Sequence, residues 1–149
     1  MSADPSTLLL PPIAPETEPF LEGTRMGELR VQRCVDTGRL VFPPRVTSPW
    51  GRRRAPEWVA VSGRGTIWSV VIPHPPLLPQ FGDVAPYNVI VVSLDEDPCV
   101  RLVGNLVTEA GAPLNSVDPH TVEIGARVRV VFDRVTDEIT LPRWVLDEA

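Results

Sequence analysis

The chain has 149 residues, a net charge of −5 and 43% hydrophobic residues, so it is long enough to form one domain with a substantial core. Proline accounts for 18 residues, about 12% against roughly 5% in average proteins, and long helices are therefore not expected. All 14 basic residues are arginine, which excludes a Schiff-base lysine and a P-loop lysine. No segment approaches the roughly 18 apolar residues of a membrane helix, and no cation precedes the first apolar run as in a signal peptide. We therefore expect a cytoplasmic protein that does not enter a membrane.

The charges are unevenly distributed along the chain. Residues 25–64 contain nine arginines and three acids, a net charge of +6, whereas residues 76–149 contain five arginines and twelve acids, a net charge of −7. The overall acidity disfavours general binding of nucleic acid. A local basic surface that faces a small phosphorylated ligand remains compatible with these numbers.

The N-terminal third is predicted to hold little regular structure. Residues 1–15 are rich in proline and aperiodic, which is typical of an extended or disordered arm. A short helix is predicted within residues 16–29, weakened by Gly23 and Gly27. The segment up to residue 56 has the turn residues of a loop-rich module, with a short strand over Leu40–Phe42.

From residue 57 onwards the pattern indicates β-structure. Strands are predicted at residues 58–62, 66–72, 87–94, 99–107, 127–133 and 140–146, where β-branched residues or alternation of apolar and polar residues prevail. Gly63 and Gly65 are expected to supply positive φ angles in a turn. Closing such strands into a barrel removes exposed edges, so a five-stranded barrel of the OB-fold type fits best. The fold class is therefore mainly β, with an arm (1–15), a helix and loop module (16–56) and a barrel (57–149).

The loop-rich module has the spacing of a zinc ribbon but lacks its ligands. A structural zinc site needs four ligands from two knuckles. The corresponding positions hold Cys34, Thr37, Ser48 and Gly51, so only one thiolate is present. We expect no metal and no zinc at this site. Cys34 is interpreted as a small buried side chain, with a reactive thiol as the alternative.

Short motifs along most of the chain support a family resemblance. They are Pro19-Phe20, Gly27-Glu28-Leu29, Gln32-Arg33-Cys34, Phe42-Pro43-Pro44-Arg45, Trp58, Val61-Ser62-Gly63-Arg64-Gly65, Trp68-Ser69 and Pro86-Tyr87. In order and spacing they resemble the OB-fold, acyl-CoA-associated proteins that carry an N-terminal rubredoxin-like zinc ribbon. The chain departs from that family by the loss of three of the four zinc cysteines.

The resemblance implies a non-catalytic partner of thiolase-superfamily enzymes, which make or break carbon–carbon bonds in acyl-CoA thioesters. Members of this family accompany archaeal thiolases, an acyltransferase of aromatic polyketide metabolism, and aldolases and hydratases that shorten steroid side chains. The implied role is to dock on the enzyme in a hetero-oligomer and help form its acyl-CoA channel, with retro-aldol cleavage of a sterol or related side chain as the favoured reaction. No tightly bound cofactor is expected, and acyl-CoA would be shared with the partner.

No catalytic residue is assigned to this chain. There is no G-x-S-x-G motif, and His74 and His120 lie in loops that contain proline, where solvent-facing histidines are common. Two alternative functions remain open. One is a single-stranded nucleic-acid-binding OB-fold that uses its tryptophans as stacking platforms, and the other is a free acyl-CoA carrier.

Two sets of residues are candidates for binding. Arg52, Arg53 and Arg54 are candidates for the phosphates of CoA, because guanidinium groups bind such oxygens bidentately, and a solvated loop is the alternative. Leu77, Leu78 and Phe81 lie in the proline-rich loop 73–86 with little nearby to bury them, so they are candidates for the partner interface. Arg45 and Arg64 are expected to brace their loops by bonding backbone carbonyls.

Overall fold

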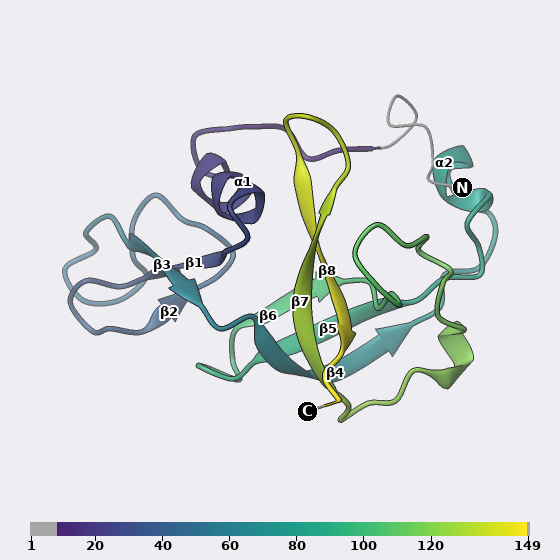
Figure 1. Cartoon of the computed structure of the whole chain (residues 1–149). Coiled ribbons are helices and arrows are strands. Elements are labelled where there is room, and N and C mark those ends of the chain that lie inside the picture. The colour runs from purple at the N-terminus through teal and green to yellow at the C-terminus, as the bar shows by residue number, and fades with distance from the viewer. Residues whose placement is uncertain (1–8, 149) are drawn as a thin grey trace.

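The structure is a computed structural model that describes residues 9–148 (Figure 1). Its elements, in chain order, are α1 (Glu18–Arg25), β1 (Leu29–Arg33), β2 (Leu40–Val41), β3 (Glu57–Val61), β4 (Arg64–Val71), α2 (Pro79–Gly82), β5 (Val89–Leu94), β6 (Arg101–Gly104), the short 3-10 helix η2 (Pro119–Thr121), β7 (Arg127–Arg134) and β8 (Thr140–Leu146). They form a three-stranded sheet in the order β2-β1-β3 and a five-stranded sheet in the order β6-β5-β4-β7-β8. The mainly β fold class is thus confirmed.

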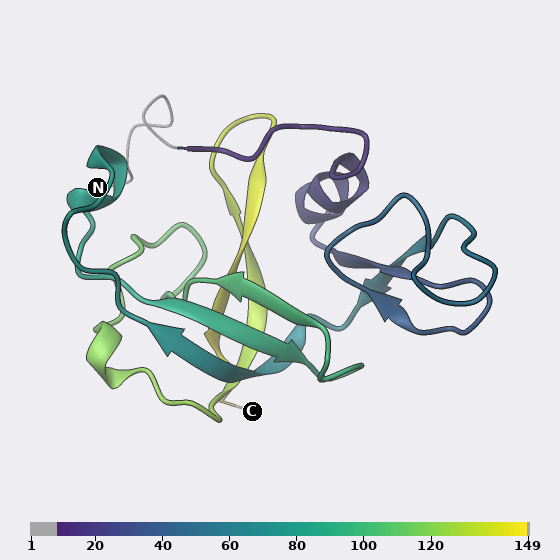
Figure 2. The ribbon, with the colours of Figure 1, turned by 180° about the vertical axis from the view of Figure 1, so that it is seen from behind.

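The arm and the first helix precede both sheets. Residues 1–8 of the expected arm lie outside the described residues, and residues 9–14 have no regular secondary structure. In both views the described part of the arm, from residue 9 onwards, runs near the tip of the β7–β8 hairpin (Figures 1 and 2). Helix α1 ends in a Schellman motif, in which the amide of Glu28 donates to Gly23 O at 2.8 Å and Gly27 takes a φ of 78°. This left-handed turn ends the helix and frees Leu29 to begin a strand.

Strand β1 was not predicted from the sequence, and it organises the N-terminal sheet. Leu29 and Val31 point into the core with exposed fractions of 1% and 0%. β3 pairs antiparallel with β1, with Leu29 opposite Val61. The chain then passes directly from β3 into β4 of the larger sheet. Because Leu29 and Val31 belong to the same hydrophobic cluster as Ile67 and Ile90 of that sheet, the two sheets share one core.

The five-stranded sheet is curled, as in an OB-fold (Figure 2). Its two edge strands, β6 and β8, approach each other where Leu106, which follows β6, forms a parallel bridge with Trp144 of β8. The amide of Val107 donates to Trp144 O at 2.8 Å, and the amide of Trp144 donates to Asn105 O at 3.0 Å. The register between β4 and β5 shifts between Ile67 and Ser69, so a β-bulge lies at this point of the central strand.

A buried hydrogen bond joins helix α1 to the barrel. Thr24 Oγ1 donates to Thr140 O at 2.6 Å, and Thr24 is 1% exposed. This hydrogen bond joins α1 to the first residue of β8, 116 positions later. No helix within residues 9–148 has the length and apolar character to cross a membrane.

The two glycines between β3 and β4 have different roles. Gly63 has a φ of 73°, as predicted for a turn. The φ of Gly65 is not positive, so that prediction was wrong. A Cβ atom at Gly65 would instead collide with the backbone oxygen of Ser93 on β5. Glycine at position 65 therefore permits close approach of two strands.

Candidate functional site

The loop-rich module keeps the shape of two knuckles without a set of zinc ligands. The first turn is closed by two hydrogen bonds, from the amide of Cys34 to Arg39 O and from the amide of Gly38 to Cys34 O, both at 2.8 Å. The second is closed by the amide of Ser48, which donates to Arg54 O at 2.8 Å. Backbone hydrogen bonds therefore stabilise the two turns that a zinc ion stabilises in a zinc ribbon.

Cys34 lies at the centre of these turns and is fully buried, as expected for the small-side-chain interpretation. Its Sγ atom lies 3.8 Å from Trp50 O. Hydrogen bonds from the side chains of Ser48 and Thr37 lower the pKa of Cys34 from 9.0 to about 7, against the opposing effect of burial. Two of the positions that correspond to zinc ligands thus carry hydroxyl groups, which accept hydrogen bonds from the amides of Arg39 and Trp50.

The residues present do not fit a structural zinc ion. Such a site needs four good ligands, usually thiolates or imidazoles. Here Cys34 is accompanied by two neutral hydroxyls and by Gly51, which has no side chain. Within residues 9–148, no group of three or more His, Cys, Asp or Glu side chains is placed to hold a metal ion. We derive no role through a metal, and the prediction of a zinc-free site can be checked by metal analysis.

Asp36 occupies the space beside the fourth former ligand position. Its Oδ2 accepts a hydrogen bond from the amide of Arg52 at 2.8 Å, and its Oδ1 lies 3.3 Å from Arg54 Nη2. A Cβ atom at Gly51 would lie 2.6 Å from Asp36 Cβ, so a larger residue at position 51 would displace this carboxylate. The side chain of Asp36 thus fastens the second knuckle to the first.

The three candidate phosphate-binding arginines lie on this second knuckle. All three are exposed. Asp36 brings together Arg52, through its backbone, and Arg54, through its side chain. Arg53 adopts a left-handed conformation with a φ of 55°. The turn therefore presents a basic surface on which Arg54 is partly neutralised.

The candidate interface residues lie around the short helix α2. Leu78 precedes this helix and is 57% exposed. Leu77 and Phe81 are half-buried, and the ring of Phe81 lies 6.0 Å from the ring of Tyr87. The loop thus folds partly on itself and leaves Leu78 as its most exposed apolar side chain among the three.

The module and the barrel enclose a pocket that the sequence did not reveal. Its volume is about 300 Å³. Arg39, Phe42, Arg45 and Trp50 contribute one side, and the turn between β5 and β6 contributes residues 97, 99 and 100. Sequence reasoning missed this pocket because its two walls are about fifty residues apart in the chain and no local motif joins them.

Two arginines of this pocket are positioned by different contacts, one through its side chain and the other through its backbone. The guanidinium of Arg39 lies 3.9 Å from the ring centroid of Trp50. The backbone of Arg45 is bound on both sides by Gln32, whose Nε2 donates to Arg45 O at 3.0 Å and whose Oε1 accepts from the Arg45 amide at 2.7 Å. The expectation that the Arg45 side chain braces the loop is wrong within the described residues, because the backbone of Arg45 is itself the part that is braced.

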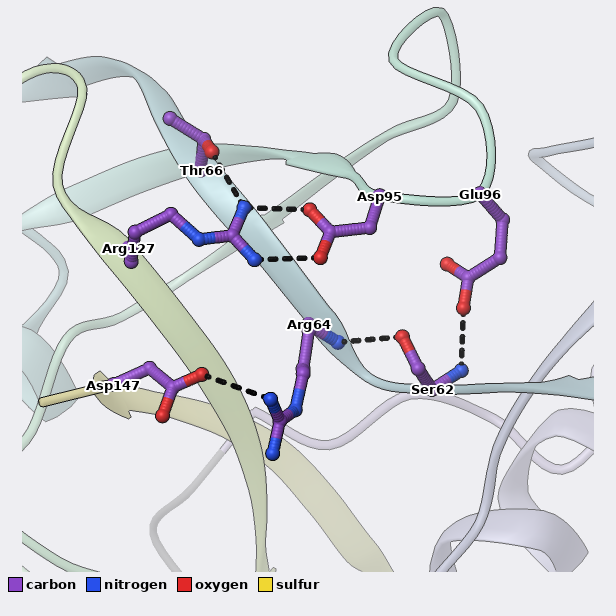
Figure 3. A network of polar contacts seen from close by, with 7 residues as sticks. All are labelled: Ser62, Arg64, Thr66, Asp95, Glu96, Arg127 and Asp147. Atoms are coloured by element: carbon purple, nitrogen blue, oxygen red, sulfur yellow. Dashed lines mark hydrogen bonds and ion pairs between the residues drawn. The ribbon is translucent and has the colours of Figure 1, made fainter. Parts of the chain in front are cut away.

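A polar network joins strand ends of the barrel next to the β5–β6 turn (Figure 3). Arg127 donates to both carboxylate oxygens of Asp95 at 2.6 Å and to Thr66 Oγ1 at 3.0 Å. The hydrogen bonds from Arg127 lower the pKa of Asp95 below its ordinary value. Arg64 was expected to bond a backbone carbonyl, but its guanidinium lies 3.8 Å from the Asp147 carboxylate instead. These contacts join strand ends and are interpreted as structural.

The histidines and most tryptophans do not gather into one site. His74 and His120 are both exposed, and the amide of His120 donates to Asp118 Oδ1 within η2. Trp144 lies in the core with 1% exposed, whereas Trp68 is 52% exposed and lies beneath the guanidinium of Arg101 at 3.8 Å. The arrangement offers surfaces for binding, and we assign no catalytic group from it.

Comparison with known families matches both parts of this architecture. The model described as "ChsH2, rubredoxin-like zinc ribbon domain" matches residues 21–48. The model described as "ChsH2, C-terminal OB-fold domain" matches residues 58–133, about half of the chain. The two matches follow one another in the order in which the structure shows the loop module and the barrel.

Individual relatives agree with these models. The chain is 35% identical over 144 residues to the 3-oxo-4,17-pregnadiene-20-carboxyl-CoA hydratase alpha subunit of Mycobacterium tuberculosis, covering 96% of this chain but only 40% of that protein. It is 34% identical over 107 residues to a DUF35 domain-containing scaffold protein of Methanothermobacter thermautotrophicus, covering 71% of this chain and 72% of that protein. The chain thus spans less than half of the hydratase subunit.

A solved structure is similar over most of both chains. The chain is similar to a chain of the Ltp2-ChsH2(DUF35) aldolase, with a TM-score of 0.71 and 28% identity, over 92% of this chain and 98% of that chain. Loop module, barrel and their order are therefore shared along nearly the whole length. On the family models and these relatives together, the chain belongs to the ChsH2 family, in which a rubredoxin-like zinc ribbon precedes an OB-fold domain.

Proposed function

We propose that this chain is a non-catalytic accessory subunit that docks on a thiolase-like enzyme and helps form its acyl-CoA channel. The observation that carries the proposal is the likeness to the Ltp2-ChsH2(DUF35) aldolase, in which the similar region accounts for 98% of the matched chain. The match therefore covers nearly the whole of one chain of that solved structure. The relative described as a scaffold protein supports a binding role in the same way.

The proposed reaction of the complex is retro-aldol cleavage of a sterol or related side-chain CoA thioester, in the cytoplasm. A base on the partner takes the proton of the β-hydroxyl group as the carbon–carbon bond breaks. The hydroxyl carbon becomes a carbonyl, and the electron pair of the broken bond forms an enolate that an oxyanion hole stabilises. Protonation of the enolate gives the shorter CoA ester. This chain supplies walls and binding contacts rather than a reacting group.

The contact with the partner is proposed to involve Leu77, Leu78 and Phe81. Apolar side chains exposed on a proline-rich loop favour protein contacts, and Leu78 is 57% exposed. In most interfaces a few well-buried side chains contribute about 1 kcal/mol or more each and account for most of the binding free energy. The proposal for Arg52, Arg53 and Arg54 is that the exposed turn contacts CoA phosphates once the partner is bound.

The test is co-purification of the partner from the native cells. The tagged wild-type chain is expected to retain a thiolase-like enzyme, identified by mass spectrometry. Leu78→Asp and the double variant with Phe81→Asp are expected to lose it, while circular dichroism shows a folded chain. Val46→Asp is the matched control, because Val46 is 72% exposed on the loop module and has no assigned contact.

The outcomes separate this proposal from its alternatives. If Leu78→Asp retains the enzyme as well as the wild type, the assignment of the loop is wrong. If the wild type retains no thiolase-like enzyme, the accessory function is wrong. Strong, salt-dependent binding of single-stranded oligonucleotides by the isolated chain would favour the nucleic-acid alternative.

A further inference from the structure

The pocket between the loop module and the β5–β6 turn is lined by two arginines, Arg39 and Arg45, and by one carboxylate, that of Asp97. Within residues 9–148, the arginines of the module 16–56 form ion pairs at Arg30, with Glu22 and Glu28, at Arg33, with Glu57, and at Arg54, with Asp36. Arg39 and Arg45 both line the pocket outside these pairs. The surrounding segment, residues 25–64, is also the basic part of the sequence, with a net charge of +6 from nine arginines and three acids. The pocket therefore attracts an anion.

Arg39 is arranged so that its hydrogen-bond donors remain available. Its guanidinium is stacked 3.9 Å from the ring centroid of Trp50. Stacking uses the flat face of a guanidinium and leaves the N–H groups at its edge, where a phosphate can be bound bidentately. Trp50 is in turn held in place, because its amide donates to Ser48 Oγ at 3.2 Å.

Arg45 is fixed at the level of the backbone. Gln32 is 5% exposed and forms hydrogen bonds with both the amide and the carbonyl of Arg45. A fixed backbone reduces the conformational entropy lost when the side chain binds a ligand. Both arginines of the pocket are thus positioned by contacts within the loop module, Arg39 by Trp50 and Arg45 by Gln32.

The remaining walls indicate the rest of the ligand. Phe42 and Val100 offer apolar surface, and Asp97 places a carboxylate on the β5–β6 side. The Oδ1 atom of Asp97 accepts from the amide of Cys99 at 2.9 Å, which fixes the carboxylate. A purely anionic ligand would be repelled by Asp97. A ligand that combines a phosphate, a flat apolar ring and N–H donors complements the arginines, the apolar surface and the Asp97 carboxylate, respectively.

We propose that this pocket binds an adenine nucleotide, with its phosphate at Arg39 and Arg45 and its base against the apolar wall beside Asp97. The volume of about 300 Å³ is at the small end of ligand pockets, so it accommodates a mononucleotide or the nucleotide end of a longer molecule. The inference rests on the proposed function only for the source of the nucleotide, which would be the acyl-CoA of the complex. Binding itself requires this chain alone.

The experiment is calorimetric titration of the full-length chain with adenosine monophosphate, adenosine and inorganic phosphate. The monophosphate is expected to bind saturably, and the other two at least about tenfold more weakly, because each lacks one half of the recognised chemistry. Arg39→Gln and Arg45→Gln are each expected to weaken binding about tenfold or more. Arg134→Gln is the matched control, since Arg134 lies at the end of β7 and its side chain is 70% exposed.

Each result decides the inference. It is overturned by the absence of saturable binding, by inorganic phosphate binding as tightly as the nucleotide, or by Arg53→Gln weakening binding while Arg45→Gln does not. Coenzyme A binding more tightly than adenosine monophosphate supports the acyl-CoA source, and equal binding supports a free nucleotide. If the wild-type chain retains the enzyme but binds no nucleotide, only this inference is refuted. If the wild-type chain binds the nucleotide but retains no enzyme, only the docking proposal is refuted.

Discussion

The carboxamide of Gln32 binds both backbone polar groups of Arg45, at 3.0 Å through Nε2 and at 2.7 Å through Oε1. A side chain on β1 thus pairs with a loop residue thirteen positions later as a neighbouring strand would. The pairing fixes the loop that follows the Phe42-Pro43-Pro44 sequence against the three-stranded sheet.

Removal of this side chain is expected to destabilise the module. Gln32→Ala leaves the amide and carbonyl of Arg45 without these partners, and we expect a loss of about 1–3 kcal/mol in the free energy of unfolding. Chemical denaturation measures it. Gln80→Ala is the matched control, because Gln80 Oε1 has no hydrogen-bond partner among the described residues. Equal losses for the two variants would show that the Gln32–Arg45 pairing contributes nothing specific.

Gly51 is expected to tolerate substitution less well than Gly38. Both have positive φ angles, 65° and 74°, so alanine is strained at each by about 1 kcal/mol. Only at Gly51 would the new Cβ also meet Asp36, at 2.6 Å, whereas nothing lies within 4 Å at Gly38. Gly51→Ala should therefore lower the free energy of unfolding by about 1–3 kcal/mol more than Gly38→Ala. Equal effects would argue against the close packing of Asp36.

The absence of zinc is itself a prediction. Because one thiolate and two hydroxyls do not form a tetrahedral zinc site, the purified chain is expected to contain no stoichiometric zinc. Incubation with a chelator should leave the thermal melting temperature unchanged. Elemental analysis that finds about one zinc per chain would contradict the interpretation of the donor set.

Substitution of Gly65 is expected to destabilise the protein, because β4 and β5 pack closely at this residue. Alanine at position 65 would bring a Cβ against the backbone oxygen of Ser93, which cannot move without disturbing the β4–β5 pairing. We expect Gly65→Ala to cost about 3 kcal/mol or to prevent folding. Gly82→Ala is the control, because nothing lies within 4 Å of a Cβ there. A fully stable Gly65→Ala chain would contradict the register of these strands.

The Asp95–Arg127 pair predicts how stability changes with acidity. The hydrogen bonds from Arg127 lower the pKa of Asp95 in the folded state, so folding favours the ionised carboxylate. The resulting stability is present above the ordinary aspartate pKa and is lost as the pH falls through the lowered value. Asp95→Asn should flatten the acid side of the stability profile. Asp137→Asn is the control, because the side chain of Asp137 is 97% exposed. An unchanged profile for Asp95→Asn would refute the assignment.

Regular strands were the part of the fold most readily predicted from the sequence. The last strand, 140–146, has the predicted bounds, and β7 differs from the predicted 127–133 by one residue. Alternation of apolar and polar residues carries this information locally. β1 was missed because Leu29 also fitted the apolar face of the preceding helix, and the turn at Gly27 decides between the two.

The candidate site was much less visible in the sequence. The positions of the lost zinc ligands were readable from spacing, but their replacement by Asp36 was not, because it depends on one side chain reaching the backbone of Arg52. The pocket likewise depends on segments that meet only after folding. Long-range geometry of this kind leaves no periodic pattern for sequence reasoning to detect.

The fastening of the second knuckle by Asp36 has a consequence for how the protein matures. A carboxylate supplied by the chain is present from the moment of synthesis, whereas an ion must be acquired from a limited cellular supply. The loops around Cys34 can therefore reach their final shape by an intramolecular process whose rate does not depend on the concentration of any second component. Provided that the chain binds no zinc, assembly with the proposed partner is expected to proceed equally well in metal-starved and metal-replete cells.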